Sequence, residues 1–171
     1  EWCAKNPQVI AMDCEMCETA DPVSGLKDSR ALCRISVVDV TTNEVLLDTL
    51  VKPAWPVSDY RTWVNGIAAE NLENVQFTLR HAQAFMLKLC SEETVIMGHA
   101  LQNDLAAIRM IHHAVVDSAY LFPVKDQPNA SISLKDLTKS VLSIDMPKTH
   151  DSVNDTRMTM ECLKYWLQKE G

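Results

Sequence analysis

Two carboxylates lie two positions apart at the end of an apolar run near the beginning of the chain. Residues 9–12 are apolar, and Asp13 and Glu15 follow them. Side chains alternate between faces along a strand, so these two carboxylates should share one face while Cys14 and Met16 occupy the other. An ionised carboxylate inside a sheet needs a cation or hydrogen-bond partners. The spacing predicts half of a metal site; the alternative is an edge strand that ends in a polar turn.

A third carboxylate lies on a predicted helix farther along the chain. Leu101, Leu105 and Ile108 form the apolar face of this helix. Asp104 lies on the same face, and metal coordination explains an inward carboxylate. The alternative is an Asp that interacts with free N–H groups at the helix start. His99, which precedes the helix, could be catalytic, although a His after a Gly at a strand end is more often a hydrogen-bonded core residue.

The last predicted helix brings a histidine close to a fourth carboxylate. Asp151 or Ser152 can cap this helix, which places Asp155 in its first turn and His150 just outside it. His150 and Asp155 can then face the same space. The alternative for this segment is a capping Asp and a solvated His. The inward apolar stripe of the helix is expected to consist of Val153, Met160, Leu163 and Leu167.

A sheet and flanking helices must position these residues. Three strands with short connections are predicted at residues 9–16, 32–39 and 44–51, which favours an antiparallel meander. Residues 26–30 read as a polar loop. Helices are expected at 78–90, 101–108 and 133–142 and from residue 151 onward, with short strands at 94–98 and 114–117. The predicted order is therefore β-β-β-α-β-α-β-α-α.

Residues 52–78 show no regular periodicity, apart from one helical turn at 68–72. Long ordered loops in compact domains are often functional. The aromatic residues of this loop and Arg61 could stack on bases or contact phosphate. The alternative is that Trp55 and Trp63 anchor the loop to the core, and we expect this role for at least one of them.

The composition fits one globular domain. The chain has 171 residues, of which 47% are apolar, and this length can bury a core. Its apolar runs are too short to span a bilayer, and no secretory leader pattern opens it. Since the sequence lacks an initiator Met, we expect a single domain over residues 1–171 that is excised from a longer protein.

The net charge and the cysteines indicate what kind of protein this is and in which redox environment it resides. The net charge is -7, which argues against a module that docks on nucleic acid by simple electrostatics but is compatible with an enzyme that holds divalent metals. The six cysteines are Cys3, Cys14, Cys17, Cys33, Cys90 and Cys162. They are scattered through apolar patterns, which favours reduced thiols in an intracellular protein. Cys14 and Cys17 could form half of a zinc site, but no second pair follows at ligand spacing.

The candidate residues together resemble the three motifs of the DEDDh 3′→5′ exonuclease superfamily. The matching positions are Asp13-x-Glu15 on the first strand, Asp104 on a helix after Gly98-His99, and His150-x4-Asp155 on the last helix. The residues around them, at 11–16, 59–62, 98–101 and 150–153, resemble the Rex-type RNA exonuclease branch. The resemblance spans residues 9–167. Two stretches depart from it: residues 20–30 look like an insertion, and Asn65 precedes Gly66 where relatives more often carry Ser.

The resemblance implies an α/β ribonuclease H-like fold, with a five-stranded mixed sheet whose first three strands are antiparallel and whose faces are flanked by helices. It implies hydrolysis of single-stranded RNA from a free 3′ end, with release of nucleoside 5′-monophosphates. We also expect a monomeric domain without membrane contact, in a nuclear or nucleolar protein. Two alternatives stay open: a DNA 3′ exonuclease with the same site, and an inactive RNA-binding scaffold. An inactive copy would be expected to lose an acid or the His, and none is lost here.

The resemblance also assigns roles. Two divalent cations, Mg²⁺ or Mn²⁺, are implied, and hard cations with oxygen ligands suit four carboxylates. Asp13 would bridge both ions, Glu15 and Asp155 would complete the site of the nucleophilic water, and Asp104 would serve the second ion. His150 would accept the proton of that water. The implied substrate contacts are Cys14, Met16, Arg61, Ile67, His99 and Leu101.

Overall fold

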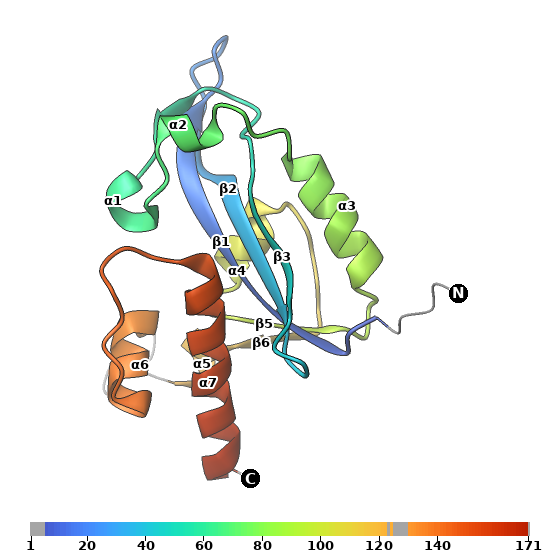
Figure 1. The fold of residues 1–171 in the computed structure, drawn as a ribbon, viewed down its shortest axis with the longest axis vertical. Coiled ribbons are helices and arrows are strands. Elements are labelled where there is room, and N and C mark those ends of the chain that lie inside the picture. The colour runs from blue at the N-terminus through green and yellow to red at the C-terminus, as the bar shows by residue number, and fades with distance from the viewer. Residues whose placement is uncertain (1–5, 123, 125–129, 171) are drawn as a thin grey trace.

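The computed structural model describes residues 6–122, 124 and 130–170, and its centre is a mixed β-sheet (Figure 1). The strands lie in the order β3-β2-β1-β5-β6, and a short strand, β4, pairs with β1 outside this path. Their bounds are β1 (Val9–Ala20), β2 (Lys27–Asp39), β3 (Val45–Leu50), β4 (Val57–Asp59), β5 (Val95–Gly98) and β6 (Val115–Asp117). The predicted antiparallel meander of the first three strands is confirmed, and β5 runs parallel to both β1 and β6.

Seven helices accompany the sheet in the described part of the chain. They are α1 (Thr62–Asn65), α2 (Ala69–Leu72), α3 (Leu79–Leu89), α4 (Gln102–Ala107), α5 (Ser118–Leu121), α6 (Leu134–Leu142) and α7 (Ser152–Glu170). The predicted helices α3, α4, α6 and α7 are confirmed. Ser133 caps α6 as expected, since its Oγ accepts a hydrogen bond of 3.1 Å from the backbone nitrogen of Asp136.

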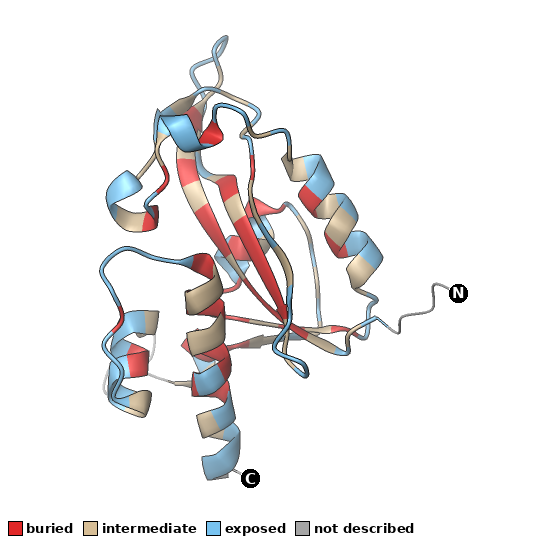
Figure 2. Cartoon of the chain, in the orientation of Figure 1, coloured by how far each residue is buried: buried red, intermediate tan, exposed pale blue. Residues whose placement is uncertain are grey.

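Helices cover both faces of the sheet, and β1 contributes to both packing layers. Met12 and Cys14 are buried in the main core cluster together with Met86 of α3 and Ala107 of α4. Ala11, one position away, packs in a separate cluster with Met160 of α7. Alternation along β1 therefore places Asp13 and Glu15 on the same face as Ala11, the face that α7 covers, and this confirms that the two carboxylates share a face. Figure 2 shows the buried residues concentrated in the central strands and on the sheet-facing sides of the helices.

The predicted polar loop at residues 26–30 is wrong. Lys27 begins β2, and the first residues of this strand pair with the end of β1, with Thr19 opposite Asp28 and Ala20 opposite Lys27. Backbone pairing does not depend on apolar side chains, so an exposed strand end can have a polar sequence. The insertion-like segment is thus a longer hairpin. Its turn is closed by Asp21, whose carbonyl oxygen accepts a bond of 2.8 Å from the nitrogen of Gly25.

The predicted count of five strands is corrected by β4, in the segment that has no regular periodicity. This strand pairs with β1 through Glu18 opposite Asp59 and Thr19 opposite Val57. Three residues are too few to show an alternating pattern. In the same segment the helical turn expected at 68–72 is present as α2, but α1 was not predicted. Trp55 is half-buried, whereas Trp63 of α1 is 81% exposed.

One further expectation concerns the inward apolar stripe of α7. Met160 and Leu163 of α7 are buried, but Leu167 is 58% exposed because the last turns of α7 extend beyond the sheet (Figures 1 and 2).

The five cysteines within the described residues are all free thiols, and Cys3 lies outside those residues. In the same part of the chain, no helix is both long and apolar enough to cross a membrane.

Candidate active site

Strand β5 ends before the acidic residues of β1, so at that position β1 has no strand neighbour on this side among the residues described. β5 pairs with Val9, Ile10 and Ala11 of β1 and then ends. Beyond this point the neighbour of β1 is helix α4. Oδ1 of Asp104 accepts a hydrogen bond of 2.7 Å from the backbone nitrogen of Cys14. Asp104 is 4% exposed, so its carboxylate faces inward, as its helical position predicted.

The N-terminus of α7 is docked on the same part of β1. Oγ of Ser152, which is fully buried, donates a hydrogen bond of 3.0 Å to the carbonyl oxygen of Asp13. Asp151 caps the helix, because its Oδ1 accepts a bond of 2.9 Å from the backbone nitrogen of Asn154. The two candidate caps thus have different roles, one capping the helix and the other tying it to the sheet. Asp155 follows in the first turn and is buried.

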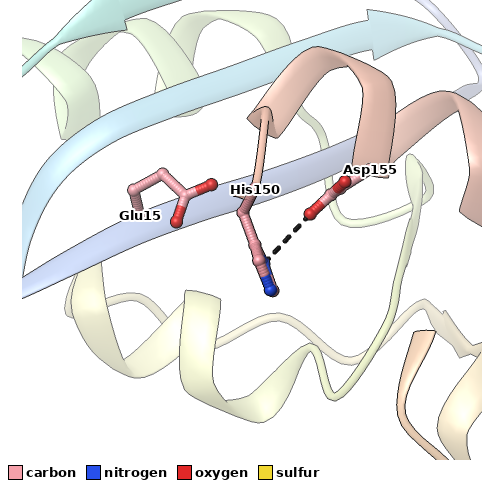
Figure 3. A group of neighbouring side chains, drawn as sticks. All are labelled: Glu15, His150 and Asp155. Carbon is pink, nitrogen blue, oxygen red and sulfur yellow. Dashed lines mark ion pairs between the residues drawn. The ribbon is translucent and has the colours of Figure 1, made fainter. Parts of the chain in front are cut away.

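Glu15, His150 and Asp155 form a compact group (Figure 3). Each offers one ligand atom, and these three atoms lie within 4.8 Å of one another. Nδ1 of His150 is 3.2 Å from Oδ2 of Asp155. In Figure 3 the two carboxylates point toward the imidazole from β1 and from α7. The imidazole is half exposed while both carboxylates are buried, so the group opens to solvent on the His150 side.

Asp13 and Asp104 are not members of that three-residue group, but electrostatics links all four carboxylates. Burial raises the pKa of Asp13 well above its usual value, and the nearby charges of Asp104, Glu15 and Asp155 raise it further. Burial also raises the pKa of Glu15 to about 7 and that of Asp104 to about 7. Asp13, Glu15 and Asp104 therefore resist ionisation in the absence of a cation.

The pKa of His150 is also raised, but for an imidazole this favours the charged form. Its hydrogen bond with Asp155 is the main reason why the pKa of the imidazole is raised, and the charge of Glu15 adds to the effect. A protonated imidazole is therefore stabilised at this position, which suits a group that accepts a proton during a reaction.

The donor set fits a hard divalent cation. Oε1 of Glu15 is buried and has no hydrogen-bond partner in the part of the chain that the structure describes. A buried carboxylate oxygen without a partner is costly unless a cation approaches it. Carboxylate oxygens are the ligands that Mg²⁺ and Mn²⁺ prefer. Glu15, Asp155 and the adjoining Asp13 and Asp104 could therefore hold such ions.

Two contacts hold the loop that carries His150. The backbone nitrogen of His150 donates a hydrogen bond of 2.7 Å to the carbonyl oxygen of Val64 in α1. On the other side, Nη1 of Arg34 lies 3.2 Å from Oδ2 of Asp151, and Nε of Arg34 lies 2.9 Å from Oδ1 of Asp48. The loop is therefore connected both to α1 and to the sheet.

The six expected substrate contacts occupy varied environments. The side chains of Cys14, Ile67 and Leu101 are buried in apolar clusters, and Met16 packs against one of these clusters. These contacts stay predictions.

The other two residues that were expected to contact the substrate, His99 and Arg61, form hydrogen bonds within the protein. His99 is hydrogen-bonded through Nδ1 to Oγ of Ser118 at 2.8 Å and through Nε2 to the carbonyl oxygen of Ile132 at 3.0 Å, as the core interpretation of this residue predicted. Arg61 precedes α1, and its backbone nitrogen donates to Oδ1 of Asp59 at 2.8 Å. Their contacts with substrate also stay predictions.

Sequence reasoning missed the residues that support the site. Arg34 carried a signal, since it is a lone charge inside the apolar run of β2. Asn65 also carried one, as a departure from the family pattern. Ser152 was identified only as a candidate cap. Its bond to Asp13 joins residues 139 positions apart, which no local pattern reveals.

The chain is similar to several proteins that are named as nucleases. The chain is 37% identical over 158 residues to RNA exonuclease 1 of Saccharomyces cerevisiae, covering 91% of this chain and 27% of that protein. It is 37% identical over 161 residues to RNA exonuclease 4 of Candida glabrata, covering 91% of this chain and 59% of that protein. It is 34% identical over 169 residues to small RNA degrading nuclease 3 of Arabidopsis thaliana, covering 96% of this chain and 21% of that protein. No protein-family model matches the chain.

The solved structures that resemble the chain confirm the fold. The Pan2 catalytic unit of Neurospora crassa aligns with a TM-score of 0.81 at 22% identity, covering 99% of this chain and 29% of that one. The apo Pan2 exonuclease module of Saccharomyces cerevisiae aligns with a TM-score of 0.75 at 23% identity, covering 97% of this chain and 29% of that one. This likeness confirms the ribonuclease H-like class. The chain spans about a quarter of the length of the first curated relatives that it matches, at 25%, 21% and 27%.

Proposed function

Because the chain belongs to the Rex-type RNA exonuclease family, we propose that it hydrolyses the phosphodiester bonds of single-stranded RNA from a free 3′ end and releases nucleoside 5′-monophosphates. The observation that carries the proposal is the group formed by Glu15, His150 and Asp155, whose ligand atoms lie within 4.8 Å of one another. Asp13 and Asp104 adjoin this group, since the charges of Asp104, Glu15 and Asp155 all raise the pKa of Asp13.

Two divalent cations, Mg²⁺ or Mn²⁺, would be held by Asp13, Glu15, Asp104 and Asp155. When bound, such cations polarise the phosphodiester and make water a better nucleophile. The buried Oε1 of Glu15, which has no hydrogen-bond partner among the described residues, supports this assignment. The hydrogen bond from the nitrogen of Cys14 fixes Asp104 in place, and the bond from Ser152 to the carbonyl of Asp13 fixes α7, and with it Asp155, on β1.

His150 would act as the general base. Its Nδ1 is engaged by Asp155 at 3.2 Å, which leaves Nε2 to accept a proton from the attacking water. The adjacent carboxylate of Asp155 stabilises the imidazolium that results. Asp155 also orients the ring, so the nitrogen that accepts the proton has a defined position.

RNA is the proposed substrate because the matched relatives are named RNA exonucleases and a small RNA degrading nuclease. One structural neighbour, the Pan2 exonuclease module of Saccharomyces cerevisiae, was solved in complex with A7 RNA, with a TM-score of 0.75 at 22% identity to this chain. Exposed Trp63 beside the His150 loop supports an unpaired strand, since an indole can stack on a free base.

The test is digestion of matched oligomers labelled at the 5′ end, as RNA and as DNA, with Mg²⁺, Mn²⁺ or EDTA. We expect RNA to shorten stepwise from the 3′ end with either cation and to persist with EDTA. A phosphate on the 3′ hydroxyl should block the reaction, and undiminished degradation would overturn the polarity. Preferred cleavage of DNA would favour the alternative substrate, and binding of RNA without cleavage would favour the inactive scaffold.

A further inference from the structure

The α1 turn is attached to β1 by one buried amide, that of Asn65. This residue is 4% exposed. Its Nδ2 donates to the carbonyl oxygens of Met16 at 3.3 Å and Tyr60 at 3.0 Å. Its Oδ1 accepts a bond of 2.8 Å from the backbone nitrogen of Ile67. One side chain thus joins β1 to the segments on both sides of α1.

The same turn supports the loop that carries His150. The carbonyl oxygen of Val64, the residue before Asn65, accepts the 2.7 Å bond from the backbone nitrogen of His150. At Gly66, an added Cβ would lie 3.2 Å from Cγ2 of Thr149, so the two segments are in direct contact. The turn therefore lies between the strand of Asp13 and Glu15 and the loop of His150.

The flanks of the turn are anchored by packing, since Ile67 is buried with Cys17 and Cys33 and Tyr60 packs against the same cluster, but the turn itself has little support of its own. It has four residues, too few for a helix that is stable by itself. A cavity of about 330 Å³ lies beside it, lined on one side by Asn65, Gly66 and Ile67 and on the other by Arg34 and Asp48 of the sheet. Since this side of the turn faces a cavity, the hydrogen bonds of Asn65 supplement the packing of the flanks in fixing where the turn lies on β1.

We propose that Asn65 is a positioning residue for His150. It fixes α1 on β1, and the carbonyl oxygen of Val64 then fixes the backbone at His150 relative to the acidic residues. The effect on catalysis rests on the proposed function, whereas the effect on the position of His150 does not. Asn65 does not touch the substrate in this proposal.

The first test is backbone amide hydrogen exchange on the Asn65→Ala variant. Loss of the side-chain bonds should free the turn and speed exchange at the His150 amide by about tenfold. The Ile96 amide, which bonds to the carbonyl of Ala114 at 2.9 Å, reports on opening of the whole core and should change less. Equal acceleration at His150 and Ile96, or unchanged exchange at His150, overturns the proposal. Asn65→Ser, which keeps an oxygen for the Ile67 nitrogen, should give an intermediate result.

The second test is a kinetic cycle with His150→Ala. Asn65→Ala alone should lower kcat by about tenfold or more while KM changes less, because a misplacement of about 1 Å can have an effect of this size. In the His150→Ala background the same change should cause no further loss, since the group it positions is gone. A loss that persists in full in that background shows that Asn65 acts independently of His150 and overturns the proposal.

Thr94→Ala is the matched control for both tests. Thr94 is as buried as Asn65, and its Oγ1 accepts a bond of 3.0 Å from the nitrogen of Ser91 before β5 begins. Its substitution should lower Tm but leave His150 exchange and kcat unchanged at a temperature well below Tm. If the wild-type protein has no nuclease activity, the proposed function fails, and hydrogen exchange alone decides whether Asn65 positions His150.

Discussion

The backbone nitrogen of Cys14 and Oδ1 of Asp104 are joined by a hydrogen bond of 2.7 Å. This bond attaches α4 to β1 at the point where β5 no longer accompanies the strand. It also brings a third carboxylate next to Asp13, whose pKa is raised by Asp104 more than by any other charge. The contact that positions Asp104 is therefore separable from the charge that Asp104 contributes.

Asp104→Asn should separate those two properties. The amide oxygen can still accept the Cys14 bond, so the fold is kept while one charge is removed. We expect nuclease activity to be lost, the metal-free Tm to be unchanged or raised, and the rise in Tm with Mn²⁺ to shrink, since binding to the folded state causes that rise. Asp145→Asn makes the same charge change on an exposed residue and should alter none of these. Full activity with an intact Mn²⁺ shift would mean that Asp104 only supports its helix.

His150→Ala should remove the general base. We expect a loss of roughly 10²–10⁴-fold in kcat, measured on labelled RNA, and a wild-type rate that rises with pH through the His range because the neutral imidazole is the active form. The Mn²⁺ shift in Tm should be mostly kept. Loss of that shift would instead make His150 a ligand, a role that its distance from Glu15 and Asp155 also allows. Exposed His113 provides the control substitution, His113→Ala.

The metal-free protein should lose stability as the pH rises. The pKa of Glu15 is raised from 4.5 to about 7 and that of Asp104 from 3.8 to about 7, in both cases mainly by burial. A group with a higher pKa in the folded state contributes stability below its unfolded pKa and loses that contribution as the pH passes its folded pKa. His150, whose pKa is raised by Asp155, acts in the same direction. Tm in EDTA should therefore fall from about pH 4 to about pH 7.

The cation should reverse this trend, because it binds the ionised carboxylates. Addition of Mn²⁺ should raise Tm more at about pH 8 than at about pH 5. Asp104→Asn should flatten the pH dependence measured in EDTA, since one titrating group is gone. A metal-free Tm that climbs across the same interval would contradict the burial of these acids.

Trp63→Ala should weaken substrate binding without changing the chemistry. The indole is 81% exposed on the turn that contacts the His150 loop, and stacking of one base contributes about 1–3 kcal/mol. KM for single-stranded RNA should therefore rise by roughly fivefold or more, with kcat nearly unchanged. Leu87→Ala alters a similarly exposed residue on α3 and should leave KM alone. Equal KM values for the wild-type protein and the Trp63 variant would remove the indole from the binding surface.

Much of the fold could be predicted because its signals are local. The apolar run before Asp13, the helical face of Leu101 and Asp104, and the start of α7 after Asp151 each depend on residues within a few positions of one another. The polar start of β2 and the three-residue β4 could not be predicted. Their backbones are paired with β1, and pairing leaves no periodic trace in so short or so polar a segment.

The amino-acid sequence by itself determined which side chains could do chemistry. These are four carboxylates on strands and helices, and a histidine just before the last helix. Only the tertiary structure decided how they are held. Ser152 binds the carbonyl of Asp13 across 139 positions, and Asp104 binds the nitrogen of Cys14 across 90. His150 depends on Val64 in the same way. Each of these bonds uses a backbone atom, which every residue possesses, so residue types alone carry no sign of the partner until packing brings the two segments together.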